Sequence, residues 1–305
     1  MATKPQDAHF LVQTGNELKK REQYDAALGA FLSAVQLKPD AELMARAQFG
    51  IGSVYNAKDN LQAAIAPLRE AIRLKPDYTE AHIKLAAVYY RLKQYPDSIA
   101  EYKIAIRLDP NDGWKYYTLG LSYKEAGRKD LATSAWKQVL TFKEKDKDML
   151  SLTGSELYEI QEYDLAFATY RAALTASQPE DANDNDGFGT ALLNAGVYEG
   201  MAKVYFARKQ YGEIVKLAES LPQNASFFPH ELGNAYVAIN QFAKAVKVFE
   251  EAATDDAQNV AESLYDLGHC YNLMGRKPDA RRIYAKLRGI EQGMALKLLT
   301  EINQK

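Results

Sequence analysis

The chain has 305 residues, of which 47% are apolar and 26% charged, so wholesale disorder is excluded. Thirty-eight Lys and Arg stand against 40 Asp and Glu, and this near-neutral balance argues against a dedicated nucleic-acid binder. The single cysteine, Cys270, excludes an internal disulfide. Neither a signal-peptide-like run at the start nor an apolar stretch of about 18 residues occurs. We therefore expect a soluble, cytoplasmic protein without membrane insertion.

One pattern recurs along nearly the whole chain, which indicates a repeat protein. The steps between the recurring small residues are 37, 34, 34, 34, 48, 31 and 35 residues, and the small residues are Gly15, Gly52, Ala86, Gly120, Gly154, Ala202, Gly233 and Gly268. A Leu or Tyr follows three residues after each, and in most units a second small residue and then a bulky residue follow. Within a unit the apolar residues recur at helical spacing, so each unit is predicted to be a pair of helices. Pro39, Pro76 and Pro110 close the first three units, where a Pro would end the second helix.

The order of small residue, Tyr, Ala, aromatic and Pro resembles the tetratricopeptide repeat, whose unit is about 34 residues long. The resemblance covers nearly the whole chain in about eight units. It implies an all-α, right-handed helix-turn-helix solenoid, that is, a tetratricopeptide superhelix. Each helix pair would leave apolar surface exposed, which only stacking on its neighbours covers.

In chain order, we expect an N-terminal tail over 1–7 and a first block of about five repeats over 8–178. An irregular acidic loop is predicted over 179–187, where the long step contains the sequence QPEDANDNDG. A second block of about three repeats covers 188–292, and an amphipathic stripe predicts a capping helix over 293–305. The first repeat of the second block is degenerate, because Ile214 replaces a small residue and Ala218 a bulky one. This exchange indicates a compensating repack.

No residue pattern indicates catalysis, a cofactor or a metal. His9, His82, His230 and His269 lack the paired spacing of metal ligands. The stretch that begins at Asp181 departs from a calcium loop, because Asp186 stands where Gly is needed and Leu192 where Glu is needed. We predict a protein that is not an enzyme.

The predicted binding surface follows from the resemblance, since the first helices of tetratricopeptide units line a concave groove. Helical periodicity places large apolar and basic side chains on that face, where a solvated surface needs no large apolar groups. The candidate groove residues are Phe49, Ile83, Lys84, Tyr90, Arg91, Trp114, Tyr117, Leu121, Lys124 and Tyr158. The alternative interpretation is that some of them pack between neighbouring first helices.

Charge divides along this face. The inward positions sum to +4 over the first four units and to −5 over the last four. The groove of the N-terminal half is therefore predicted to prefer an acidic segment with apolar anchors.

The resemblance implies a non-catalytic scaffold that binds a peptide or helix of a partner protein. It does not extend to the chaperone carboxylate clamp, whose places fall on Val12, Asn16, Gly50, Glu80 and Lys84. Only Asn16 matches outright, and Glu80 would repel a carboxylate. Two other hypotheses remain open: self-assembly through the same surfaces, head-to-tail or as a dimer, and a role as the regulatory subunit of a separate enzyme.

Overall fold

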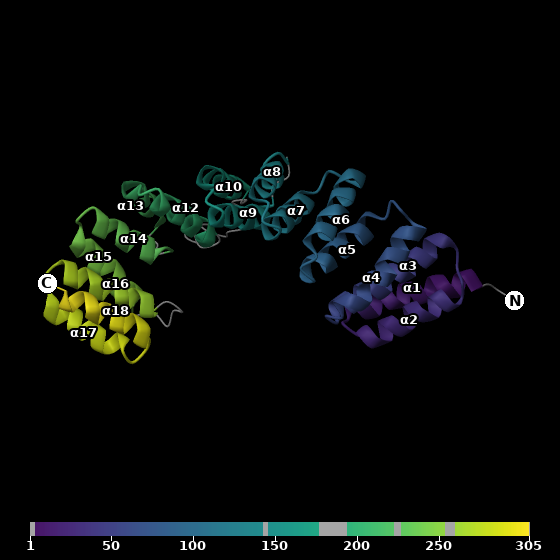
Figure 1. The fold of residues 1–305 in the computed structure, drawn as a ribbon, viewed down its shortest axis with the longest axis horizontal. Helices are drawn as coiled ribbons and strands as arrows, with labels where there is room; N and C mark the ends of the chain where they lie inside the picture. The colour runs from purple at the N-terminus through teal and green to yellow at the C-terminus, as the bar shows by residue number, and fades with distance from the viewer. Residues whose placement is uncertain (1–3, 143–145, 177–193, 223–226, 254–259, 305) are drawn as a thin grey trace. The chain divides into compact units, whose positions relative to one another are not determined.

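The computed structural model describes residues 4–142, 146–176, 194–222, 227–253 and 260–304. These residues form seventeen α-helices and no strand, which confirms the predicted all-α class (Figure 1). Contacts between Cα atoms divide the chain into two compact units, unit 1 over 1–144 and unit 2 over 145–305. The predicted loop at 179–187 lies outside the described residues, so the block boundary placed there stays a prediction.

Unit 1 consists of four helix pairs, each with its two helices packed against one another. The pairs are α1 (Lys4–Lys20) with α2 (Tyr24–Gln36), α3 (Ala41–Ala57) with α4 (Leu61–Leu74), α5 (Thr79–Arg91) with α6 (Tyr95–Leu108), and α7 (Gly113–Glu125) with α8 (Lys129–Val139). The second helices α4 and α6 end two residues before Pro76 and Pro110, and α2 ends three residues before Pro39. Pro has no backbone N–H to donate and restricts the residue before it, so it ends a helix.

Unit 2 contains four more pairs and a final helix. They are α9 (Lys147–Glu159) with α10 (Tyr163–Ala176), α12 (Ala195–Ala207) with α13 (Tyr211–Glu219), α14 (Pro229–Ala238) with α15 (Phe242–Ala252), α16 (Val260–Leu273) with α17 (Lys277–Leu287), and α18 (Gln292–Asn303). The α18 helix packs on α16 and α17 and buries Ala295, Leu298 and Ile302. The eight predicted pairs and the predicted capping helix are thus confirmed.

The recurring glycines have a packing reason. Phe31 of α2 lies beneath the recurring Gly15 and beneath Gly50 of α3, because a Cβ added to Gly15 or Gly50 would come within 2.7 or 2.5 Å of its ring. In the fourth pair a Cβ on Gly120 would stand 2.1 Å from the Trp136 indole. A bulky second-helix side chain can therefore fill the space beneath the first helix of its own pair and that of the next.

The degenerate sixth pair keeps its core despite the exchange of large and small residues. Ile214 and Ala218 are both buried in α13, which is only nine residues long. The bulky side chain has moved one helical turn along the same buried face, in agreement with the expected repack.

The turn inside every pair has one backbone conformation. Each contains a residue with positive φ, seven positions after the recurring small residue, and these residues are Glu22, Asp59, Lys93, Gly127, Gln161, Lys209, Asn240 and Gly275. The left-handed conformation suits glycine, yet only two of the eight are glycine. In the fourth pair, the amides of Gly127 and Arg128 donate to the carbonyls of Lys124 and Tyr123 at 2.9 Å each, which satisfies the end of α7.

Candidate functional site

The first helix α3 of unit 1 contacts both α1 and α5. Side chains of these helices and of Tyr78, the N-cap residue of α5, form the basic-aromatic cluster of Lys19, Arg46, Phe49, Tyr78 and Lys84. At its centre the Phe49 and Tyr78 rings pack with centroids 5.0 Å apart. The Lys19 ammonium lies 5.8 Å from the centroid of the Phe49 ring, within the range of a cation–π contact.

The three cations of this cluster lack anionic partners. Burial lowers the pKa of Lys19, and the nearby charges of Lys84 and Lys20 lower it further. Burial raises the pKa of Tyr78 to about 12; Glu80 adds to the rise and Arg46 opposes it. Within the described ranges, no residue forms a hydrogen bond or ion pair with Lys19, Arg46 or Lys84. Positive charge is thus held on the half-buried Lys19 and Lys84 and the exposed Arg46, and an incoming anion could neutralise it.

Two predicted groove residues belong partly to the core. Phe49 packs against the cluster of buried residues that includes Leu68 and Leu85, and Ile83 packs against the one that includes Tyr102. Both side chains are half-buried, so each is a core residue with one side left for a ligand.

Arg91 is already engaged. Its guanidinium donates to the backbone oxygen and the Oδ1 of Asn56, at 3.1 and 2.9 Å, and pairs with Asp59. It therefore ties α5 to the turn of the preceding pair. Nearby, the half-buried Tyr90 ring meets Tyr95 edge-on with centroids 5.8 Å apart.

The predicted groove residues of α7 divide into exposed and buried. Trp114 is 39% exposed, whereas Tyr117 is only 8% exposed and meets the Trp114 ring edge-on, with centroids 5.6 Å apart. Leu121 and Lys124 are half-buried. Trp114 is consequently the most exposed of the predicted groove residues on this helix.

Tyr158, the last of the predicted groove residues, lies on α9 in unit 2. Its ring packs on Tyr163 with centroids 5.6 Å apart. Burial raises its pKa, with further effects from Tyr163, Lys203 and Glu231. Binding of a peptide by any of the ten predicted residues stays a prediction.

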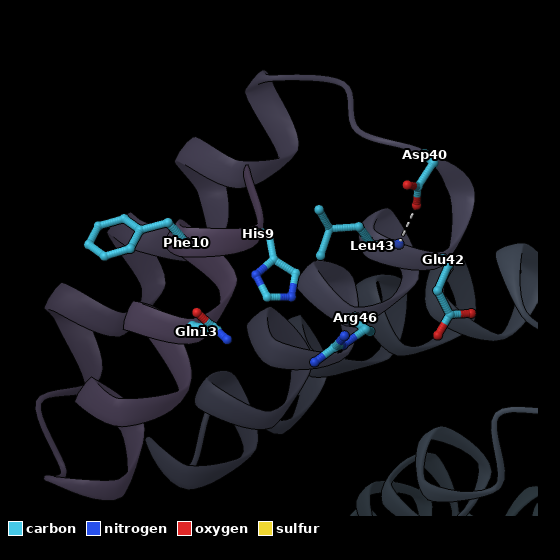
Figure 2. Close-up of a pocket in the computed structure, with 7 residues that line it drawn as sticks. All are labelled: His9, Phe10, Gln13, Asp40, Glu42, Leu43 and Arg46. Atoms are coloured by element: carbon cyan, nitrogen blue, oxygen red, sulfur yellow. Dashed lines mark hydrogen bonds between the residues drawn. The ribbon is translucent and has the colours of Figure 1, made fainter. Parts of the chain in front are cut away.

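A cavity that sequence reasoning did not predict opens in unit 1 between α1 and the start of α3, with a volume of about 470 Å³. His9, Phe10 and Gln13 line it from α1, and Leu43 and Arg46 from α3. Figure 2 shows the His9 ring beside Leu43 and Arg46, with Gln13 on the other side of His9 and the ring of Phe10 pointing away from Leu43. One feature of the sequence could have indicated this cavity: Phe10 is a large apolar residue next to the inward-facing positions of α1.

The described residues contain no group of three His, Cys, Asp or Glu side chains that could hold a metal ion. None of their helices is both long enough and apolar enough to cross a membrane.

Comparison with known families agrees with the geometry. A model described as "TPR repeat" matches residues 52–93 and 88–127, and one described as "Tetratricopeptide repeat" matches 117–182 and 230–294. Together these matches take in more than half of the chain, in the same pairs that the fold shows. The chain belongs to the tetratricopeptide repeat family.

Several known proteins are similar to this chain over parts of their length. Superkiller protein 3 of Schizosaccharomyces pombe is 24% identical over 272 residues, which are 84% of this chain and 19% of that protein. The DnaJ homolog subfamily C member 7 homolog of Dictyostelium discoideum is 27% identical over 120 residues, 38% of this chain and 22% of that protein. The chain thus spans about a fifth of the length of these two relatives. A tetratricopeptide repeat protein from Parabacteroides merdae has the same fold, with a TM-score of 0.50 and 15% identity over 86% of this chain and 98% of that one.

Proposed function

We propose that this protein is a non-catalytic interaction scaffold and that the first-helix surface of unit 1 binds an acidic segment of a partner protein. The observation that carries the proposal is the basic-aromatic cluster, where Lys19, Arg46 and Lys84 surround a half-buried aromatic pair without acidic partners. Like charges held together cost free energy, and an acidic ligand removes that cost on binding.

The same surface offers apolar anchoring. The exposed part of Trp114 and the half-buried Phe49 are aromatic groups of the kind that dominate binding energy at interfaces. The cations would set the orientation of the segment and speed its association, and the aromatic groups would slow its release.

The test uses the full chain and a fluorescein-labelled peptide of about eight Glu residues around one Phe, followed by fluorescence anisotropy. Lys19→Glu combined with Lys84→Glu should weaken binding at least about tenfold at low salt, because two attractive charges become repulsive. The affinity of the unaltered protein should fall as salt is added, since these groups are only partly buried.

The matched control reverses two charges on the opposite helix of the third pair. Lys103 and Arg107 of α6 are exposed, and no described residue forms a hydrogen bond or ion pair with either. Lys103→Glu with Arg107→Glu changes the net charge by the same amount and should leave affinity within about threefold, through long-range effects alone. Equal losses from both double variants would mean that net charge, and not this surface, attracts the peptide.

A further inference from the structure

The cavity between α1 and α3 combines an apolar wall with a free cation. Leu43 forms the wall and is 6% exposed, whereas Phe10 at the rim is 66% exposed. A ring this exposed gains free energy when a ligand covers it. The cavity therefore suits a ligand with a bulky apolar body.

Two carboxylates also line the cavity, but each already has a partner. Asp40 accepts a hydrogen bond from the Leu43 amide at 2.8 Å and so caps α3. Glu42 accepts one from the Lys75 ammonium at 2.9 Å. Asp40 is thus engaged at the start of α3, and Glu42 is engaged by a lysine at the end of α4.

Arg46 differs from the two carboxylates in its lack of a partner. In the part of the chain that the structure describes, its guanidinium forms no hydrogen bond or ion pair, although it lines the same cavity as both carboxylates. Figure 2 shows it beside the side chains of His9 and Gln13, which add further polar atoms. A planar guanidinium with free N–H donors is suited to a carboxylate, which it can hold through two parallel hydrogen bonds.

We propose that this cavity is an anchor pocket for a bulky apolar side chain that lies next to a carboxylate, with the apolar group against Leu43 and Phe10 and the carboxylate on Arg46. The proposal rests on the proposed function, since the occupant is the acidic segment of the partner protein. It adds the place where one apolar anchor of that segment docks.

The experiment probes the pocket with a small molecule that carries only these two features. 3-Phenylpropionate is titrated into the full chain, and the methyl signals of Leu43 are followed by NMR. We expect a saturable shift of these signals, because the phenyl ring would lie against them. 3-Phenylpropionamide, which has the same shape without the charge, should bind at least about fivefold more weakly, the effect of one accessible ion pair.

Variants then test each feature. Arg46→Gln should remove the difference between the acid and the amide, and Phe10→Ala should weaken both. Arg107→Gln and Leu32→Ala are the matched controls, since Leu32 is 43% exposed on α2 and neither residue lines the cavity. Equal binding of acid and amide, or no shift of the Leu43 signals, would overturn the anchor pocket.

The failure of this pocket is distinguishable from failure of the proposed function. One outcome is that the acidic peptide still binds and still depends on Lys19 and Lys84 while the Leu43 signals do not respond to 3-phenylpropionate. That result supports the proposed function and refutes the anchor pocket. If the Leu43 signals shift with protein concentration alone, the pocket is occupied by a second copy of the chain, and the proposal is equally overturned.

Discussion

The two units share one repeat but treat their charged first-helix residues differently. In unit 1, Lys19, Arg46 and Lys84 have no acidic partner among the described residues. In unit 2, two of the acidic residues have basic partners: Asp266 accepts a hydrogen bond from His230 at 2.6 Å, and Glu199 pairs with Lys203 at 2.5 Å. A sum of charges over each half predicts two charged grooves of opposite sign, whereas the contacts pair Glu199 and Asp266 of unit 2 and leave Lys19, Arg46 and Lys84 of unit 1 without a partner among the described residues.

The difference teaches that the net charge of a surface is a poor guide to what it binds. A carboxylate that already accepts a hydrogen bond from a histidine offers little to a ligand, because the ligand must first displace that partner. We therefore expect the electrostatic part of recognition to lie in unit 1. The following predictions test the contrast, from the largest effect to the smallest.

The largest effect concerns packing at the bulky repeat position, which Trp136 fills in unit 1 and Ala218 occupies in unit 2. Trp136 is fully buried, and its indole N–H donates to the Tyr117 carbonyl at 3.0 Å. Trp136→Ala should lower the free energy of unfolding by about 3–5 kcal/mol. Ala218→Gly at the equivalent position should lower it by about 1 kcal/mol. Urea denaturation measures both, and equal losses would show that the sixth pair depends on this position as much as the fourth does.

The second prediction removes a compensating charge in unit 2. His230→Ala leaves Asp266, which is 7% exposed, without its imidazole partner. Stability at pH 6 should fall by about 1–3 kcal/mol, the cost of a buried acceptor that loses a charged donor. His9→Ala is the control, because His9 is exposed on α1, and it should change stability by less than about 0.5 kcal/mol. A neutral result for His230→Ala would mean that the acidic face of unit 2 is as open to ligands as the basic face of unit 1.

The third prediction is a pH dependence in unit 1. The buried His82 ring meets two acceptors, a Glu101 carboxylate oxygen 2.6 Å from Nδ1 and the Pro76 carbonyl 3.0 Å from Nε2. Burial lowers its pKa, but the bonds to Glu101 and Pro76 outweigh it, so the pKa lies above its ordinary value. Only the imidazolium can donate to both acceptors.

The sign follows from that rise. Stabilisation by His82 is fully present below the unfolded-state pKa of about 6.5 and is lost as pH rises through the folded-state pKa. Urea denaturation of the unaltered chain and of His82→Gln should therefore show a larger stability gap at pH 5.5 than at pH 9. A gap that does not change with pH would show that the pKa of the ring is the same in the folded and the unfolded protein.

The smallest effect is expected to be equal in the two units, because the turn inside each pair is the same. Lys93→Gly in unit 1 and Lys209→Gly in unit 2 replace residues with positive φ, and each should stabilise the fold by about 0.5–1 kcal/mol. Gly127→Ala should destabilise it by a similar amount. Thermal unfolding measures all three, and a gain in one unit alone would show that its turn is more strained than that of the other unit.

The sequence predicts the helix pairs well because they depend on local spacing. The small residue, the bulky residue sixteen positions later and the closing Pro all act within one unit, and every pair that they predict is present. The capping helix also follows from its own apolar stripe, with Ala295, Leu298 and Ile302 buried as expected.

The binding surface is predicted less completely, because it depends on which side chains meet across different pairs. Periodicity places Arg91 and Tyr117 on the groove face, but Arg91 turns back to Asp59 and Tyr117 is covered. Likewise, the charge of the cavity beside Phe10 depends on Glu42, whose partner Lys75 lies 33 positions further along the chain. Such pairings are tertiary, and no spacing within a unit encodes them.

The shared bulky side chains have a mechanical consequence. Because Phe31 fills the space beneath glycines of two successive first helices, as Tyr170 does beneath Gly154 and Gly200, much of the cohesion lies in the boundaries between pairs. Tension applied to the ends of such a chain would detach terminal pairs first, since each has a neighbour on only one side. Extension would then proceed in small steps at modest force, and each detached pair would find an intact template on which to refold. A tether built in this way yields under load and recovers its length when the load is removed.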